Sequence, residues 1–172
     1  SLEKIWYNGF TNCTNLETVI LPSNLKTISK EAFKNCPKLS TITYKENESG
    51  KNKFPDSLTY IDVSAFENDT ALTNIDLNKV QTIKVQAFRE SGLTEIYLPD
   101  SLTHIEPRAF NMCNNLHKIS GGKGIQDNLA DSVTHNTIDP NYKHDGKDIF
   151  DVADYFGANE SYTGYPLSPY HK

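Results

Sequence analysis

The sequence is poor in several features that mark large classes of protein. Its 172 residues include three cysteines, one methionine and one tryptophan, and 37% of them are apolar. No apolar run approaches the ~20 residues that a membrane-spanning helix needs, and no signal-peptide pattern opens the chain. With 17 basic and 22 acidic side chains there is no basic excess, so nucleic-acid binding is disfavoured.

Catalytic motifs are missing as well. The five histidines are scattered, and the chain has no His-Glu-x-x-His spacing, no phosphate-binding loop and no Gly-x-Ser-x-Gly motif. Catalysis requires a nucleophile with its base, paired carboxylates or a metal cluster. We therefore predict that this part of the protein is not an enzyme and uses neither a cofactor nor a metal ion.

The sequence does contain an Ala-Phe dipeptide that recurs within a constant frame of apolar residues. A Leu or Val lies eight residues before each Phe, and an Ile follows three residues after that Leu or Val. A Leu lies five or six residues after each Phe, and a branched residue three further on. With one Gly-Phe variant, the phenylalanines are spaced by 23, 33, 22 and 22 residues: Phe10, Phe33, Phe66, Phe88 and Phe110. A repeat of this length with leucine-type positions at fixed offsets indicates a leucine-rich solenoid.

The two halves of the repeat predict different local structures. The alternation Ile-x-Leu predicts a short strand, which Pro22 and Pro99 end by removing a backbone donor. The second half, Leu-x-x-Ile, predicts a brief extended or turn segment on the opposite side, and the phenylalanines are expected to stack as a spine. The fold class is therefore an α/β leucine-rich repeat rich in β structure. We expect a right-handed solenoid of about five coils of 22–23 residues, with short strands and turn or 3-10 segments.

One string within the repeat is more specific than the rest. The pattern Ile-x-x-x-Ala-Phe-x-x-Cys-x-x-Leu runs from Ile28 to Leu39 and returns from Ile105 to Leu116. In this string the chain resembles the BspA-like, treponemal-type leucine-rich repeat family of cell-surface proteins. The resemblance implies a bacterial protein that is secreted or held at the cell surface and acts in adhesion, with a host or extracellular-matrix protein as partner. The fourth copy departs from the pattern, because it is one residue shorter after Phe88.

The repeat pattern covers only part of the chain. We assign residues 1–119 to the solenoid, which starts within a repeat, and residues 120–172 to a C-terminal cap or the start of a separate surface module. A start within a repeat suggests a fragment whose signal and anchor lie elsewhere. Asp139 and Asp145 suggest a calcium loop, but His144 stands where an EF-hand requires Gly. Residues 142–149 are similar to the opening of mucin-binding-type repeats, which would favour a surface module.

The cysteines occupy one position of the repeat. Cys13, Cys36 and Cys113 each follow a repeat Phe by three residues, and Asp69 and Ser91 hold that place in the other copies. A Cys13–Cys36 disulfide or a metal site is one interpretation. We favour a column of small buried residues in which Cys packs as a small hydrophobe.

The candidate binding residues flank the inward positions of the predicted strands. Tyr97 is the best single anchor, because exposed Tyr is enriched at interfaces. The outward columns contain Thr18, Thr41, Asn74, Glu95 and Lys118, then Ile20, Thr43, Asp76, Tyr97 and Ser120. A solvated face without a partner remains the alternative, in which case the solenoid is a structural spacer holding another domain away from the cell surface. The polar insertion at residues 45–53 is expected to be a surface loop rather than a binding loop.

Overall fold

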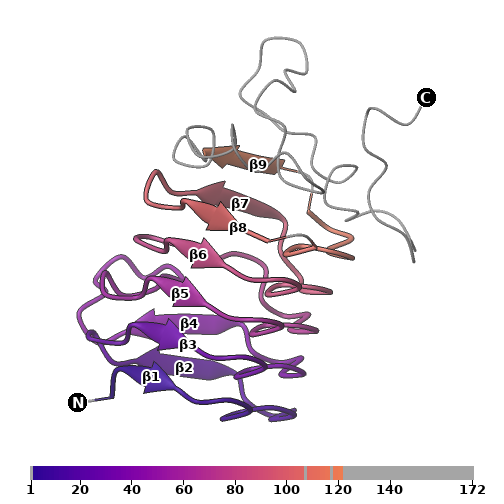
Figure 1. Cartoon of the computed structure of the whole chain (residues 1–172). Helices are drawn as coiled ribbons and strands as arrows, with labels where there is room; N and C mark the ends of the chain where they lie inside the picture. The colour runs from indigo at the N-terminus through magenta and orange to yellow at the C-terminus, as the bar shows by residue number, and fades with distance from the viewer. Residues whose placement is uncertain (1, 107, 117, 122–172) are drawn as a thin grey trace.

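The protein is a stack of parallel coils along one axis (Figure 1). The computed structural model describes residues 2–106, 108–116 and 118–121, and for residues 118–120 it describes the backbone alone. Every strand pair among these residues is parallel, and they contain no helix. The described residues therefore hold no helix that could cross a membrane. Of the predicted C-terminal cap only residues 120–121 are described, and the calcium stretch and the segment similar to mucin-binding-type repeats lie outside the described residues.

The second half of the repeat forms the longer sheet. Its strands have two residues each and pair in the order β1-β3-β5-β6-β8. Their bounds are β1 Lys4–Ile5, β3 Thr27–Ile28, β5 Tyr60–Ile61, β6 Thr82–Ile83 and β8 His104–Ile105. In each strand the Ile is buried against the core. The Leu-x-x-Ile segment is thus extended on every coil, and this sheet, called here the ladder face, is unbroken from the first coil to the last described one.

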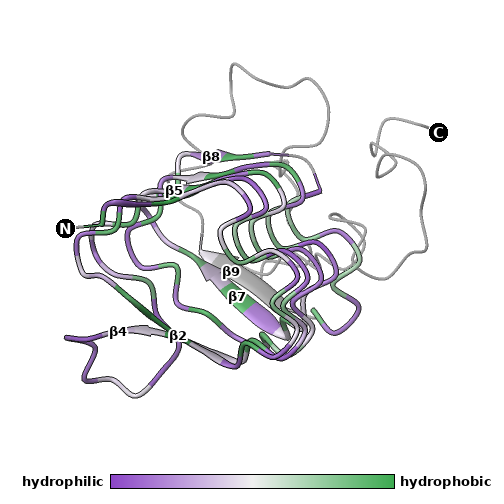
Figure 2. Cartoon of the chain, turned by 90° about the horizontal axis from the view of Figure 1, so that it is seen from below, coloured by the Kyte–Doolittle hydropathy of each residue, from purple (hydrophilic) through white to green (hydrophobic). Residues whose placement is uncertain are grey.

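The predicted strands of the first half are present on the opposite side, which we call the broken face, except in the third coil, where Asp76 makes only an isolated bridge. They form two separate two-stranded sheets, visible as distinct pairs when the stack is viewed along its axis (Figure 2). The strands are β2 Thr18–Leu21 with β4 Thr41–Tyr44, and β7 Glu95–Leu98 with β9 Lys118–Gly121. β2 and β7 end immediately before Pro22 and Pro99, as the sequence predicts.

The core is built around the repeat phenylalanines. Their rings stack from coil to coil with centroids 5.1, 5.3, 5.2 and 5.5 Å apart, which confirms the predicted spine. The alanine beside each ring is fully buried in the second to fifth coils, so its small side chain lets the coil close against the ring. Phe54 adds a tilted contact to Phe66 at 5.7 Å. The buried residues form one continuous core along the axis.

The bend that carries the Ala-Phe dipeptide depends on left-handed backbone positions. In the bend of each coil two non-glycine residues have φ between 54° and 64°, one before the Ala or Gly and one two residues after the Phe. Asn12, Asn35 and Asn68 hold the second of these positions, and Asn tolerates it better than most residues. Their side chains also form a hydrogen-bonded ladder: Asn35 donates to Asn12 at 2.8 Å and Asn68 donates to Asn35 at 3.1 Å.

Candidate interaction face

The broken face positions the candidate residues through the alternation of its strands. Along β7, Glu95 and Tyr97 are exposed while Ile96 and Leu98 are buried. Along β2, Thr18 and Ile20 are exposed and Leu21 is buried. Successive side chains of a strand point to opposite sides, so the core fixes which residues face outward.

The insertion in the third coil contributes to this face as well as forming a loop. Lys53 makes a parallel backbone bridge with Asp76, and its N–H donates to the Ile42 carbonyl at 3.0 Å. Phe54 and Pro55 then take the places that Leu and Pro hold in other coils. The segment at residues 52–54 therefore forms an extra rung between β4 and residues 74–77.

Asn52 fastens this extra rung to both neighbouring coils. Its amide donates to the carbonyls of Ser40 at 2.8 Å and Asn74 at 3.1 Å, and its oxygen accepts the Ile42 N–H at 3.1 Å. The expectation of a simple surface loop thus holds for the start of the insertion and fails at its end. The recurrence of an apolar residue before Pro55 is the sequence signal that could have identified the rung.

Two large apolar side chains project from the broken face. Ile20 is 67% exposed and Tyr97 is 57% exposed. The strand register places Ile20 opposite Thr43, and Tyr97 opposite Ser120. The row that contains them reads Ile20, Thr43, Lys53, Asp76, Tyr97 and Ser120.

The Tyr97 ring is held close to the backbone of the next coil. A Cβ added at Gly121 would lie 2.9 Å from Tyr97 Cε2 and 2.2 Å from the Leu98 carbonyl oxygen. Gly121 also has a φ of +84°, which favours glycine. The absence of a side chain at Gly121 therefore makes room for the ring of Tyr97.

The structure brings the predicted columns together only in part. Thr18 pairs with Thr41, and Glu95 pairs with Lys118, but the two pairs belong to different sheets. Thr41 and Thr43 are half-buried, whereas Asn74 and Asp76 are exposed. For Lys118 and Ser120 the structure gives the strand register and not the side chains. Whether the ten residues bind a partner remains a prediction.

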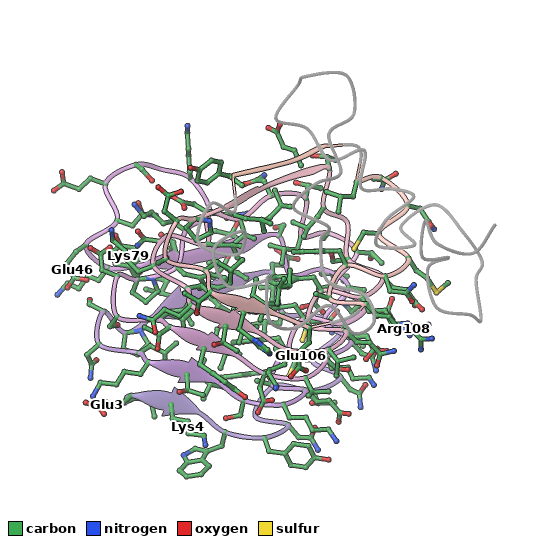
Figure 3. The ribbon with its side chains drawn as sticks, turned by 45° about the horizontal axis from the view of Figure 1, so that its top comes forward. Glu3, Lys4, Glu46, Lys79, Glu106 and Arg108 are labelled. Atoms are coloured by element: carbon green, nitrogen blue, oxygen red, sulfur yellow. The ribbon has the colours of Figure 1, made fainter. Side chains whose placement is uncertain are left out.

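The ladder face is a second outward surface, which the sequence analysis did not consider as a candidate. One of its rows contains Lys4, Thr27, Tyr60, Thr82 and His104. Charged side chains lie along its edges: Glu3 pairs with Lys26 at 2.9 Å, and Glu106 pairs with Lys84. Glu3 and Lys4 project from the first coil and Glu106 from the last described one (Figure 3). This row is polar and exposes no large aliphatic side chain.

The bend carries a partly buried charge cluster around Glu67. Lys34 Nζ lies 3.1 Å and Arg89 Nη1 lies 2.8 Å from the Glu67 carboxylate. Burial alone would raise the pKa of Glu67, but hydrogen bonds from Ser64, Lys34 and Arg89 outweigh it and hold the pKa below the ordinary value. The cluster joins three successive coils and has a structural role.

The repeat-locked cysteines are free thiols, so the Cys13–Cys36 disulfide is absent. Cys36 and Cys113 are buried and Cys13 is half-buried, as a column of small packed residues requires. Burial raises the pKa of Cys36 to about 12 and that of Cys113 to about 11, so both are protonated. The described residues contain no group of three or more His, Cys, Asp or Glu that could hold a metal ion.

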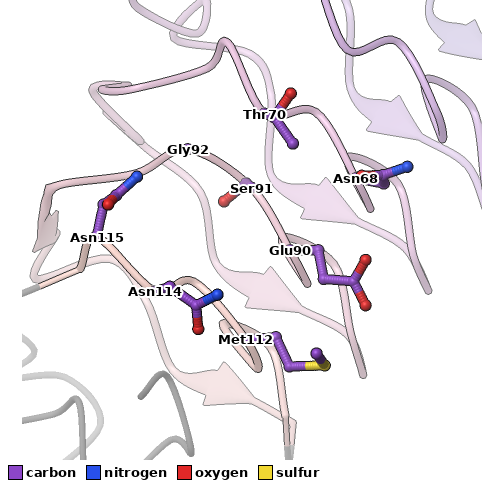
Figure 4. A pocket seen from close by; sticks show the side chains of 8 residues that line it. All are labelled: Asn68, Thr70, Glu90, Ser91, Gly92, Met112, Asn114 and Asn115. Atoms are coloured by element: carbon purple, nitrogen blue, oxygen red, sulfur yellow. The ribbon is translucent and has the colours of Figure 1, made fainter. Parts of the chain in front are cut away.

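A hollow of about 280 Å³ lies where the fourth coil is one residue short (Figure 4). Ser91 and Gly92 line it together with Asn68, Thr70 and Asn114. An added Cβ at Gly92 would lie 2.1 Å from the Thr70 carbonyl oxygen, so the shortened turn is pressed against the coil before it. The one-residue deletion noted in the sequence thus shapes the surface without disturbing the phenylalanine stack.

Solved structures with the same architecture come from several bacteria. A leucine-rich repeat protein from Bacteroides ovatus is 31% identical over 68% of this chain and 28% of its own, with a TM-score of 0.59. The Treponema pallidum leucine-rich repeat protein is 28% identical over 68% of this chain and 51% of its own, with a TM-score of 0.60. A leucine-rich cell surface protein from Faecalibacterium prausnitzii is 27% identical over 69% and 36%, with a TM-score of 0.51. The chain thus spans about half or less of each of these proteins.

The family assignment rests on the repeats themselves. The model of the BspA-type leucine-rich repeat region matches residues 1–117 and 48–139, with six copies. No curated protein matches the chain. The phenylalanine spine, the parallel coils and the matched repeats together show that this chain belongs to the BspA-type leucine-rich repeat family.

Proposed function

We propose that this chain is a non-enzymatic binding protein of the cell surface or the secreted fraction, and that its broken face binds a host or extracellular-matrix protein in adhesion. The observation that carries the proposal is the exposure of Ile20 and Tyr97 in one row of that face. Two large apolar side chains on a scaffold of rigid coils are suited to contact a protein partner.

The solenoid does not need these two side chains for its own packing. The Leu, Ile and Phe positions that define the second to fourth coils are buried, and they fill the core without Ile20 or Tyr97. The register partners Thr43 and Ser120 are polar, so the coil accepts polar residues at this position. The presence of large apolar side chains at Ile20 and Tyr97 is therefore better explained by contact with a partner than by folding.

Charged groups between the two apolar side chains supply the polar part of such a contact. Lys53 Nζ lies 3.6 Å from Asp76 Oδ2, and both belong to the same row. Interfaces combine apolar anchors with surrounding polar groups, and the anchors supply most of the affinity. We therefore assign the anchoring role to Tyr97 and Ile20 and a role in specificity to Lys53 and Asp76.

Three observations support a partner outside the cell. The chain belongs to a family whose members the sequence analysis associates with adhesion, and one similar structure is a cell surface protein. The broken face also presents two apolar side chains, Ile20 and Tyr97, rather than a basic patch. A protein surface is the partner that this mixture of apolar and paired charged groups fits.

The decisive experiment measures binding of the 172-residue chain to immobilised extracellular-matrix proteins such as collagen, fibronectin and laminin. We expect Tyr97→Ala to weaken binding about tenfold or more, as truncation of an interface anchor does. Tyr7→Ala is a matched control, because Tyr7 is also 57% exposed but lies on the bend of the first coil. It is expected to leave affinity unchanged.

Charge variants separate anchoring from specificity. Asp76→Lys places two like charges in the row and is expected to weaken binding, whereas Lys53→Asp combined with Asp76→Lys restores the ion pair with reversed sign. Retention of full affinity by Tyr97→Ala and Ile20→Ala together would rule out the broken face as the binding surface. Failure of the chain to bind any matrix protein would favour the spacer role.

A further inference from the structure

Asp69 is the one residue of the cysteine column that carries a carboxyl group. It is fully buried, as are Cys36 and Cys113 at the equivalent positions. Asp69 Oδ1 accepts the backbone N–H of Cys36 at 2.8 Å. The second oxygen, Oδ2, is buried without any hydrogen-bond partner among the described residues. A buried carboxylate oxygen without a donor is a costly arrangement that requires an explanation.

The coil before Asp69 has a different hydrogen-bonding pattern at its own column residue, Cys36. In three other coils the backbone N–H of the column residue donates to the carbonyl of the Phe three residues earlier, at 3.1–3.2 Å: Cys13, Ser91 and Cys113. The Cys36 N–H is directed to Asp69 instead. The Phe33 carbonyl thereby lacks the donor that the carbonyls of Phe10, Phe88 and Phe110 have.

Side chains of this column also reach the coil before them. Cys36 Sγ donates to the Phe10 carbonyl at 3.1 Å, and Cys113 Sγ donates to the Phe88 carbonyl at 3.0 Å. The equivalent acceptor for Asp69 is the Phe33 carbonyl. An ionised carboxylate would oppose that oxygen with another acceptor, whereas a neutral acid has one acceptor and one donor to offer.

We propose that Asp69 is protonated in the folded protein at neutral pH and that its Oδ2–H donates to the Phe33 carbonyl, which makes the junction of the second and third coils a pH-sensitive joint. The neutral acid then replaces both partners of the missing turn hydrogen bond: Oδ1 serves the Cys36 N–H, and Oδ2 serves the Phe33 carbonyl. A neutral Asp69 thus explains two observations: the buried Oδ2 without a partner, and the Cys36 N–H that does not bond within its own turn.

The electrostatic surroundings agree with a neutral acid. Burial raises the pKa of Asp69 to about 8, although the Cys36 N–H opposes that rise. Cys36 faces it from the preceding coil and is neutral in this range, and the column residue of the following coil is Ser91, which does not titrate. The nearby Glu67 is already paired with Lys34 and Arg89, so no cation is left in that cluster for Asp69.

The sign of the pH effect follows from the raised pKa. In the unfolded chain Asp69 ionises near its ordinary value, whereas in the folded chain it keeps its proton until about pH 8. The stabilising contribution is complete below the unfolded pKa and is lost as the pH rises towards the folded pKa. Between the two, the folded state binds one more proton than the unfolded state.

The test compares chemical unfolding of the full chain and of Asp69→Asn from pH 5 to pH 9. Between pH 5 and pH 7 we expect the unfolding equilibrium constant of the unaltered chain, relative to Asp69→Asn, to rise about tenfold per pH unit. Above about pH 8 the ratio should level off. Asn offers the same acceptor and donor without ionising, and both proteins share all five histidines, so their titration cancels.

A second measurement keeps the proposal testable if Asp69→Asn does not fold. The carboxyl carbon of Asp69, followed by NMR in the unaltered chain and assigned with Asp69→Ser, should titrate near pH 8. Ser is the residue that the fourth coil holds at this place. A carboxyl midpoint near the ordinary Asp value, or equal pH slopes for the unaltered chain and Asp69→Asn, would overturn the proposal.

Discussion

Lys53 and Asp76 lie side by side on the broken face: their backbones form a parallel bridge, and Lys53 Nζ lies 3.6 Å from Asp76 Oδ2. Lys53 belongs to the polar insertion, and Asp76 belongs to the regular repeat. Their pairing shows that the insertion returns to the solenoid and adds a rung to it before the chain continues. The rung depends on Asn52, which hydrogen-bonds to the coils on both sides.

Replacement of Asn52 by Ala should destabilise the third coil. The change removes hydrogen bonds to the Ser40 and Asn74 carbonyls and to the Ile42 N–H. We expect it to lower the free energy of unfolding by roughly 2 kcal/mol. Asn47→Ala is the control, because the described hydrogen bonds of the Asn47 side chain join it to Ser49 and Lys51 of the insertion loop and to Thr43 beside it. Chemical denaturation should show a loss below about 1 kcal/mol for the control. Equal losses for the two variants would contradict the role of Asn52 in joining the extra rung to its neighbouring coils.

Truncation of a ring in the middle of the spine should be among the most damaging single changes. Phe88 stacks between Phe66 and Phe110, with centroids 5.2 and 5.5 Å away, and it is fully buried. Phe88→Ala is expected to cost about 3–5 kcal/mol, since it leaves a cavity in a packed core. Phe10→Ala should cost less in the same denaturation series, because Phe10 is 39% exposed and stacks only on Phe33 among the described rings.

The shortened turn of the fourth coil should not accept a side chain at Gly92. A Cβ there would lie 2.1 Å from the Thr70 carbonyl oxygen, which belongs to backbone and cannot rotate away. Gly50→Ala provides the comparison: its Cβ would meet nothing within 4 Å, so only its φ of +67° opposes Ala, at roughly 1 kcal/mol. Thermal melting should show a clearly larger drop for Gly92→Ala. A drop no larger than that of Gly50→Ala would mean that the close contact at Thr70 relaxes freely.

Acid should weaken the protein through Glu67. Because the pKa of Glu67 is lowered in the folded protein, its contribution is present above the unfolded pKa and is lost as the pH falls through the folded pKa. Glu67→Gln should cost about 1–2 kcal/mol at pH 7 and should remove this part of the acid sensitivity. Urea denaturation from pH 3 to pH 7 measures both effects. Parallel pH profiles for the two proteins would contradict this role for Glu67.

The acid and neutral ranges should therefore respond to different residues. Glu67 acts on the acid side, where its ion pairs with Lys34 and Arg89 are lost on protonation. Asp69 acts between its ordinary pKa and about pH 8, where the unfolded chain has lost the proton that the folded chain keeps. Comparing the Glu67→Gln and Asp69→Asn variants with the double variant separates the two effects. Each single change removes one residue's contribution to the pH dependence of stability, and the double variant removes both.

Sequence reasoning predicted the coil well and the faces less well. The spacing of the apolar positions was sufficient for the phenylalanine spine, the inward isoleucines and the strand ends before Pro22 and Pro99, since each follows from local pattern and burial. It was not sufficient to show that the ladder face would be the continuous sheet. Two-residue strands have almost no pattern of their own, and they exist because neighbouring coils supply their partners.

The same limit explains what was missed at the candidate site. The columns through Thr18 and Ile20 could be proposed from the repeat, because outward positions follow from inward ones. Lys53 was treated as part of a loop, although Phe54 and Pro55 restore the pattern directly after it. Its place beside Asp76 depends on how far the insertion travels before it rejoins the stack, and the spacing of apolar residues carries no information on that path.

The sequence by itself determined the solenoid, because leucine, isoleucine and phenylalanine at fixed intervals can all be buried only when successive coils stack in register. The tertiary structure decided the rest. It placed Asn52 between two coils, broke one face into separate sheets, laid the Tyr97 ring against Gly121 and directed the Cys36 N–H to Asp69. Each of these depends on contact between residues distant in the chain, where polar groups find their partners only once the coils have come together.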